Sequence, residues 1–165
     1  MSNKEHVFFK GPAVHVHFHV KQGLIHQIDL TSSSSSSLQW SIYSDIKNSE
    51  TEHLIQTWLA DYVNGSPTST HLPLDWHKIA PFTTKVLLEI QMIPFGSALS
   101  YGELACLIRH PTAARAVGRA CGQNPFPLFI PCHRVLNAKR ALCGFSEGLD
   151  IKKALLQFEK ISFKN

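Results

Sequence analysis

The chain has 165 residues, of which 44% are hydrophobic and 17% are charged, a balance typical of a folded protein and not of a disordered one. That length can bury a substantial core in one domain or in two small ones. No apolar run approaches the length of a membrane span, and residues 1–10 lack the apolar segment of a signal peptide. We therefore expect a cytoplasmic protein that does not associate with membranes.

The formal net charge of +4 is divided unevenly along the chain. Residues 1–80 hold five lysines and seven acidic side chains, a net charge of −2, whereas residues 81–165 hold six lysines, five arginines and five acidic side chains, a net charge of +6. A basic second half indicates a nucleic-acid partner, with a solvated basic surface as the alternative.

The four cysteines, Cys106, Cys121, Cys132 and Cys143, form no C-x-x-C pair. This spacing argues against a zinc site and against a disulfide framework, and it suits a reducing compartment. We expect neither a metal nor a cofactor.

The first half is predicted to be a small α/β scaffold. Residues 14–20 alternate strictly, so they predict a strand with His15, His17 and His19 on its polar face, and residues 24–30 complete a hairpin after a turn at Gly23. The three histidines could bind a metal, but with no cysteine or acid between them a merely polar outer face is the preferred interpretation. A strand over 38–43 and an amphipathic helix over 54–63 are predicted to follow.

Two stretches are predicted to be connections. The six serines at 32–37 form a low-complexity loop, and residues 66–73, which are rich in serine, threonine and proline, are expected to join two domains. We predict a scaffold domain over 1–75 and a second domain over 76–165.

The second domain begins with predicted helices. Apolar residues from 82 to 90 predict the first helix, and Ser100 and Glu103 have the spacing of a capping box that opens the next one. Thr112 is a candidate cap for a further helix over 113–121. Helix, short turn, helix is the layout of a DNA-binding motif, although simple helical hairpins share it.

The helix over 113–121 carries Arg115 and Arg119 on one face among alanines and a glycine. Small side chains let a helix backbone approach a surface closely, and the helix offers almost no groups that could read base edges. It therefore predicts binding to DNA without sequence preference, with Arg115 as a wedge into the duplex. The alternative is an alanine-rich core helix with two solvated arginines.

Cys132, followed at once by His133 and Arg134, is the candidate nucleophile, since a reactive thiolate needs a basic neighbour. A buried structural cysteine is the alternative. A strand over 128–130 is predicted to deliver this residue, and strand, basic loop and strand over 135–142 would form a wing. The last helix, 150–160, is predicted to carry Lys152 and Glu159 on one stripe.

These residues resemble the O6-alkylguanine-DNA alkyltransferase family. The resemblance runs from Phe82 to Glu159 and rests on three motifs in order, namely residues 113–118, Asn124-Pro125 and Pro131-Cys132-His133-Arg134-Val135. It implies an α/β (α+β) fold, with a ribonuclease-H-like N-terminal domain built on an antiparallel sheet and a winged helix-turn-helix C-terminal domain.

The resemblance also implies a repair protein that flips an alkylated guanine out of duplex DNA and moves the alkyl group irreversibly onto its own cysteine. Cys132 would be the acceptor, His133 would act on it through a water, and Glu159 would orient His133. Tyr101 would donate its hydroxyl to the departing guanine, and Lys152 would support the tyrosine or the guanine. The residues expected to contact substrate or DNA are Arg115, Arg119, Asn124, Arg134, Val135, Phe145 and Ser146.

Within that set, Arg115 would fill the gap left by the flipped nucleotide, and Asn124 would hold the turn that carries the cysteine. The backbone of Cys132 and Val135 would accept hydrogen bonds from the guanine amine, and the Ser146 amide would face O6. The partner would be duplex DNA that contains O6-alkylguanine. The protein is expected to be a monomer, and the sequence leaves open whether copies assemble along DNA.

Two positions depart from the family pattern, because Phe145 stands where relatives have tyrosine and Glu147 stands where glycine is frequent. The zinc site of some relatives is not carried over, because the first half has no cysteine. Two alternatives remain, a winged-helix protein that binds alkylated DNA without transfer and a Cys–His hydrolase.

Overall fold

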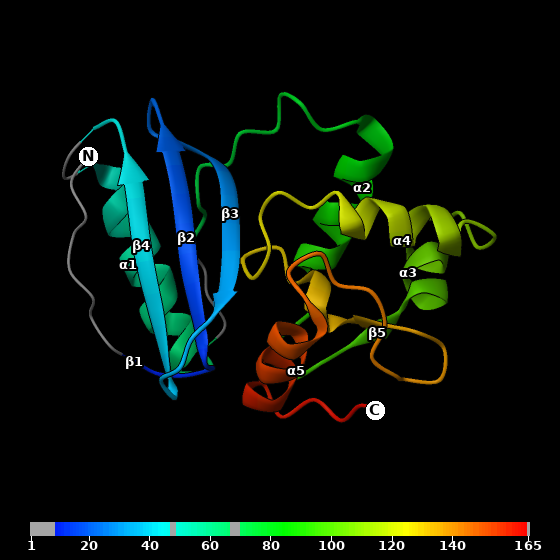
Figure 1. Cartoon of the computed structure of the whole chain (residues 1–165). Helices are drawn as coiled ribbons and strands as arrows, with labels where there is room; N and C mark the ends of the chain where they lie inside the picture. The colour runs from blue at the N-terminus through cyan, green and yellow to red at the C-terminus, as the bar shows by residue number, and fades with distance from the viewer. Residues whose placement is uncertain (1–8, 47–48, 67–69, 165) are drawn as a thin grey trace. The chain divides into compact units, whose positions relative to one another are not determined.

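The structure is a computed structural model that describes residues 9–46, 49–66 and 70–164. The chain forms two compact units, Met1–His77 and Lys78–Asn165 (Figure 1), and each is described by itself. Two predictions fall at least partly outside the described residues. One is the absence of a signal peptide from residues 1–10, of which 1–8 are not described, and the other is the connection over 66–73, of which 67–69 are not described.

The first unit contains a four-stranded sheet made of β1 (Phe9–Lys10), β2 (Val14–Lys21), β3 (Leu24–Ser32) and β4 (Ser37–Ser44). The strand order is β1-β4-β2-β3. The three long strands were predicted. The prediction of an antiparallel sheet was wrong, because β2 and β4 pair in parallel. The reason is that the serine-rich connection carries the chain across to the other edge of β2 instead of closing a second hairpin beside β3.

One face of this sheet is apolar and packs against α1 (Glu50–Val63), which lies along it in Figure 1. Val14, Val16, Phe18 and Val20 of β2 are buried because alternate strand residues point to the same face. The predicted helix is confirmed, and the predicted polar face is as well: the histidines of β2 lie half-buried on the side away from these residues.

The second unit begins with three packed helices, α2 (Pro81–Gln91), α3 (Tyr101–Leu107) and α4 (Ala114–Gly122). The predicted capping box is confirmed, since the Glu103 amide donates to the Ser100 hydroxyl and the Ser100 amide donates to the Glu103 carboxylate. The prediction that Thr112 caps α4 was wrong. The N-cap is Ala113, which has no side-chain acceptor, and α4 starts without a side-chain cap.

The rest of the second unit comprises the short parallel pair β5 (Leu99–Ser100) and β6 (Val135–Leu136), the single turn η1 (Cys132–Arg134) and α5 (Leu149–Phe158). Residues 128–130 form a buried turn and not the predicted strand. The strand predicted at 135–136 is present as β6, which pairs with β5, and Ala141, in the second predicted strand, forms an isolated bridge with Lys164 at the C-terminus.

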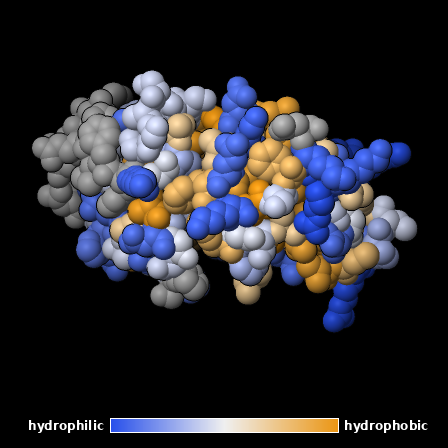
Figure 2. Space-filling model, turned by 90° about the horizontal axis from the view of Figure 1, so that it is seen from below, coloured by the Kyte–Doolittle hydropathy of each residue, from blue (hydrophilic) through white to orange (hydrophobic). Residues whose placement is uncertain are grey.

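Apolar residues of α2, α3 and α4 form one part of the core, and Leu136, Leu156 and Ile161 form another. Hydrophobic surface is also visible between protruding hydrophilic side chains in Figure 2. Single exposed apolar residues are normal on protein surfaces and carry no functional inference. None of the described helices is long and apolar enough to cross a membrane.

Candidate active site

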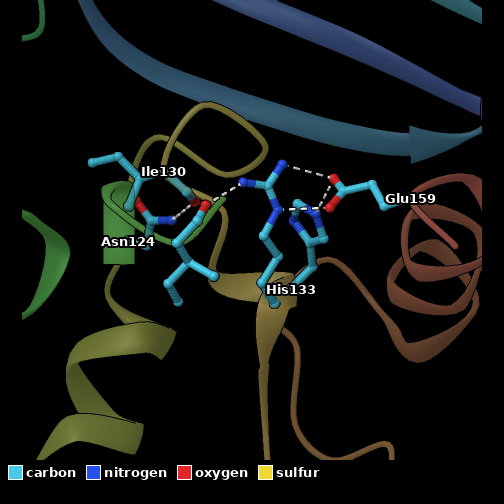
Figure 3. Close-up of polar contacts among 6 residues, drawn as sticks. Asn124, Ile130, His133 and Glu159 are labelled. Carbon is cyan, nitrogen blue, oxygen red and sulfur yellow. Dashed lines mark hydrogen bonds and ion pairs between the residues drawn. The ribbon is translucent and has the colours of Figure 1, made fainter. Parts of the chain in front are cut away.

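The centre of the site is a turn, residues 124–131, that leads from α4 into η1. Asn124 organises it: its amide nitrogen Nδ2 donates to the Ile130 carbonyl at 2.9 Å (Figure 3), and its Oδ1 accepts from the Phe126 amide at 2.9 Å. Leu128 adopts a left-handed φ of 72°, which is unfavourable for a bulky side chain, within a turn whose residues are all buried except the half-buried Pro125. Asn124 therefore fixes the backbone that delivers the cysteine.

Cys132 follows this turn and is buried, with 4% of its surface exposed. Asn124 Nδ2 also donates to its Sγ at 3.1 Å. Burial raises the pKa of the Cys132 thiol to about 11, the charge of Glu147 adds to this, and the hydrogen bond from Asn124 and the charge of Lys152 oppose it. The resting group at neutral pH is thus a thiol, which must lose its proton as it reacts.

His133, the residue after Cys132, forms a wholly buried pair with Glu159, and Figure 3 shows the two side chains pointing toward each other. His133 Nε2 lies 2.7 Å from Glu159 Oε1. Burial alone would raise the pKa of the Glu159 carboxyl, but the charges and hydrogen bonds of His133 and Arg134 outweigh it and hold that pKa at about 2. The acid is ionised, so Nε2 is the nitrogen that donates.

Arg134 differs from the expectation that it contacts DNA. Its guanidinium is buried, and it donates to Glu159 from Nε at 2.6 Å and from one terminal nitrogen at 3.0 Å. The other terminal nitrogen donates to the Ile93 carbonyl at 2.6 Å. A guanidinium with these partners faces the interior and not a phosphate.

Lys152, on α5, is buried. Its Nζ donates to the carbonyls of Val135 at 2.8 Å and Cys143 at 2.9 Å, and burial lowers its pKa. The Cys143 thiol in turn makes a long hydrogen bond of 3.7 Å to the Tyr101 hydroxyl. Lys152 is thus linked to Tyr101 through Cys143, and it already uses one of the two lone pairs of the Val135 carbonyl.

The remaining predicted contacts lie around this centre. Burial raises the pKa of the Tyr101 hydroxyl, so this group stays a hydrogen-bond donor. The ring of Phe145 lies 5.9 Å from Lys152 Nζ, a cation–π distance, and Ser146 is exposed in the same loop. Arg115 and Arg119 are exposed on α4, away from the buried centre.

Two features of the site were not found from the sequence. One is the contact of Cys143 with Tyr101 and Lys152, which no local pattern indicates, because Cys143 lies in an irregular loop 42 residues from Tyr101. The other is that the Glu159 carboxylate accepts hydrogen bonds from both His133 and Arg134.

Within the described ranges, no three side chains of His, Cys, Asp or Glu gather so as to hold a metal ion, and this includes the histidines of β2.

The family model described as "6-O-methylguanine DNA methyltransferase, DNA binding domain" matches residues 81–161, which contain every residue of this site. Residues 81–161 of the chain are thus similar to the DNA-binding domain of the 6-O-methylguanine DNA methyltransferase family. Its fold is similar to the crystal structure of the Mycobacterium tuberculosis OGT in complex with DNA, with a TM-score of 0.63, 29% identity and coverage of 88% of this chain and 92% of that chain.

Curated relatives with this activity in their names align with part of the chain. The constitutive methylated-DNA–protein-cysteine methyltransferase of Bacillus subtilis is 40% identical over 107 residues, which are 64% of each chain. The methylated-DNA–protein-cysteine methyltransferase of Haemophilus influenzae is 43% identical over 103 residues, which are 62% of this chain and 57% of the relative. The chain thus spans about three-fifths of the length of these relatives.

Proposed function

We propose that this protein repairs DNA by moving the alkyl group of O6-alkylguanine, typically a methyl group, onto its own Cys132. The observation that carries the proposal is that Cys132 is buried and that its neighbour in the chain, His133, is paired with the buried Glu159, inside the domain matched by the family model. A thiol and an oriented imidazole are the parts of an activated nucleophile.

The chemical step follows from these groups. Cys132 Sγ attacks the alkyl carbon, the new S–C bond forms as the C–O6 bond breaks, and guanine leaves. The thiol proton passes to His133 through a water. The guanine anion takes up a proton from solvent and His133 releases its proton to solvent, so that charge and atoms balance. The thioether cannot return to a thiol by this route. Each protein molecule therefore reacts once and needs no cofactor.

The pocket residues supply the polar contacts to guanine in this proposal. Tyr101 donates its hydroxyl to the departing base, and Lys152 acts on Tyr101 through Cys143. The Cys132 and Val135 carbonyls, which already accept from the Val135 amide and from Lys152 Nζ, each accept a further hydrogen bond from the guanine amine. The loop with Phe145 and Ser146 forms the wall near O6. The link from Lys152 through Cys143 to Tyr101 supports this arrangement.

DNA binding is assigned to α3 and α4, used as a helix-turn-helix. Arg115 and Arg119 are exposed on α4, and the second half of the chain carries the net positive charge, which supports this assignment. Arg115 would enter the space of the flipped nucleotide. We further propose that the loop 137–143 acts as the wing, since the C-terminal segment holds it through the Leu142 and Lys164 amides.

The finer assignments are proposed together with this function. They are a monomeric protein that acts in the cytoplasm on duplex DNA, and a ribonuclease-H-like first unit that serves as a scaffold. The parallel pairing of β2 with β4 beside the antiparallel β2–β3 hairpin is compatible with that scaffold.

The test is a mass measurement after incubation with a duplex that contains one O6-methylguanine. We expect the peptide that contains Cys132 to gain one methyl group in place of one hydrogen, and the DNA to regain guanine. A Cys132→Ser variant should bind the same duplex and gain nothing. Binding by the unaltered protein without any methyl gain would instead indicate a protein that recognises alkylated DNA without transfer.

A further inference from the structure

Arg134 is fully engaged inside the second unit. Two of its nitrogens donate to the two oxygens of Glu159, at 2.6 and 3.0 Å, and the third donates to the Ile93 carbonyl at 2.6 Å. Its guanidinium also lies 5.9 Å from the centre of the Phe95 ring. A bidentate guanidinium–carboxylate pair is the strongest common ion-pair geometry, and here both partners are buried.

Glu159 is therefore shared between two cations or potential cations. Its Oε1 accepts from His133 Nε2 at 2.7 Å as well as from Arg134 at 3.0 Å. A carboxylate that accepts from Nε2 fixes the neutral ring with its proton on Nε2. The lone pair of His133 Nδ1 is then available, and among the described residues this buried nitrogen has no hydrogen-bond partner.

The charge of the cluster depends on Arg134. A buried carboxylate beside an imidazole, with no other cation, favours the imidazolium, because it would otherwise be an uncompensated charge. With Arg134 present, the carboxylate is already neutralised, and a proton on His133 would add a second positive charge beside Arg134 and Lys152. The pKa of His133 is accordingly lowered by burial first and also by Arg134 and Lys152, while Glu159 opposes them.

We propose that Arg134 is a positioning residue that keeps His133 neutral, with its proton on Nε2, so that Nδ1 is ready to take the proton of the Cys132 thiol. The inference rests on the proposed function, because a base is needed only if Cys132 reacts. It explains how a base stays available at neutral pH inside a charged, buried cluster. It assigns Arg134 to proton transfer and not to DNA binding.

The first test uses nitrogen NMR of His133 in the unaltered full chain at pH 7. We expect the signals of a neutral ring protonated at Nε2. A cationic ring at this pH, or a ring protonated at Nδ1, would overturn the inference. This measurement requires no variant and no reaction.

The second test compares three variants by the same NMR titration and by the pH profile of single-turnover transfer. Arg134→Gln should raise the pKa of His133 by about one unit or more, and the acid limb of the transfer profile should move in the same direction. Arg134→Lys keeps the charge and should largely restore both. Arg140→Gln is the matched control, because Arg140 also pairs with a carboxylate, Glu103, but at the surface, and it should leave the titration of His133 unchanged.

The outcomes are separable. An Arg134→Gln variant that is folded and slow but leaves the titration of His133 unmoved would show that Arg134 is merely structural. If Arg134→Gln does not fold, the NMR state of the unaltered protein and the Arg134→Lys titration still decide. Failure of the proposed function would look different, because the unaltered protein would transfer no methyl group while His133 could still titrate as expected.

Discussion

The two units contain histidine–carboxylate pairs of nearly equal length in opposite settings. His19 lies 2.8 Å from Asp29 on the sheet of the first unit, where the side chains are 33% and 39% exposed. His133 lies 2.7 Å from Glu159 in the second unit, where both are 0% exposed. Hydrogen-bond length therefore does not distinguish the two settings, whereas burial and a third charged partner do.

Water explains the difference. On the sheet, solvent screens the charges, and breaking such a pair changes little. In the second unit the low-dielectric surroundings make each charge depend on its partners, so the loss of one partner leaves the others uncompensated. The comparison can be tested with paired variants, one from each setting.

The largest expected effect is on transfer. His133→Gln should slow single-turnover methyl transfer by about 10²- to 10⁴-fold, because it removes the general base. His17→Gln, at a half-buried histidine on the polar face of the sheet, should leave the rate within about twofold, since His17 belongs to the first unit and the thiol and its proposed base both belong to the second. Quenched-flow or rapid-mixing assays with radiolabelled DNA measure both. Equal loss in the two variants would contradict the distinction.

The next effect is on stability. Glu159→Gln should lower the free energy of unfolding by about 3–5 kcal/mol, because it leaves the buried Arg134 charge uncompensated. Asp29→Asn should lower it by less than about 1 kcal/mol, because water screens the pair with His19. Urea denaturation at pH 7 measures both values. A smaller loss for Glu159→Gln than for Asp29→Asn would refute the role given to burial.

A smaller effect is expected for the turn. Asn124→Ala should cost about 2 kcal/mol and slow transfer, because it removes bonds to the Ile130 carbonyl, the Phe126 amide and the Cys132 sulfur, all of them buried. Asn137→Ala is the control, since Asn137 Oδ1 also accepts from two backbone amides, of Lys139 and Ala141, but in a more exposed loop. Comparable losses in stability for the two would show that exposure does not matter here.

The smallest effect concerns pH. Burial lowers the pKa of His17 below its ordinary value of 6.5, with Asp29 opposing this and His19 adding to it. The unfolded chain therefore binds the extra proton first, and this contribution to stability falls as the pH drops below about 6.5. NMR titration should place the pKa of His17 below that value, and His17→Gln should flatten the pH dependence of unfolding in this range. A pKa above 6.5 would reverse the sign.

The parts that could be predicted from the sequence are those with local causes. The alternation of apolar and polar residues predicted the buried face of β2, and the spacing of Ser100 and Glu103 predicted the start of α3. Both features depend only on residues a few positions apart. The pairing of β6 with β5 and the parallel position of β4 depend on partners far along the chain, so local patterns favoured hairpins instead. Thr112 failed as a cap because α4 begins one residue later than a Thr112 cap would require.

The site shows the same division. Cys132 and His133 stand out in the sequence because they are adjacent and chemically distinctive. Arg134 is equally conspicuous in the sequence but was predicted to contact DNA. The sequence alone does not show which basic residue will pair with a distant carboxylate inside the fold. Cys143 could not be found at all, since its contact with Tyr101 exists only after the loop folds back onto α3.

The most direct measurement of the central claim is the number of methyl groups on Cys132 per protein molecule as damaged duplex is added in excess. The account predicts that the number rises to one and stays there, that repaired guanine never exceeds the amount of protein, and that Cys106, Cys121 and Cys143 remain unmodified. Continued turnover, or a methyl group on any cysteine other than Cys132, would contradict it.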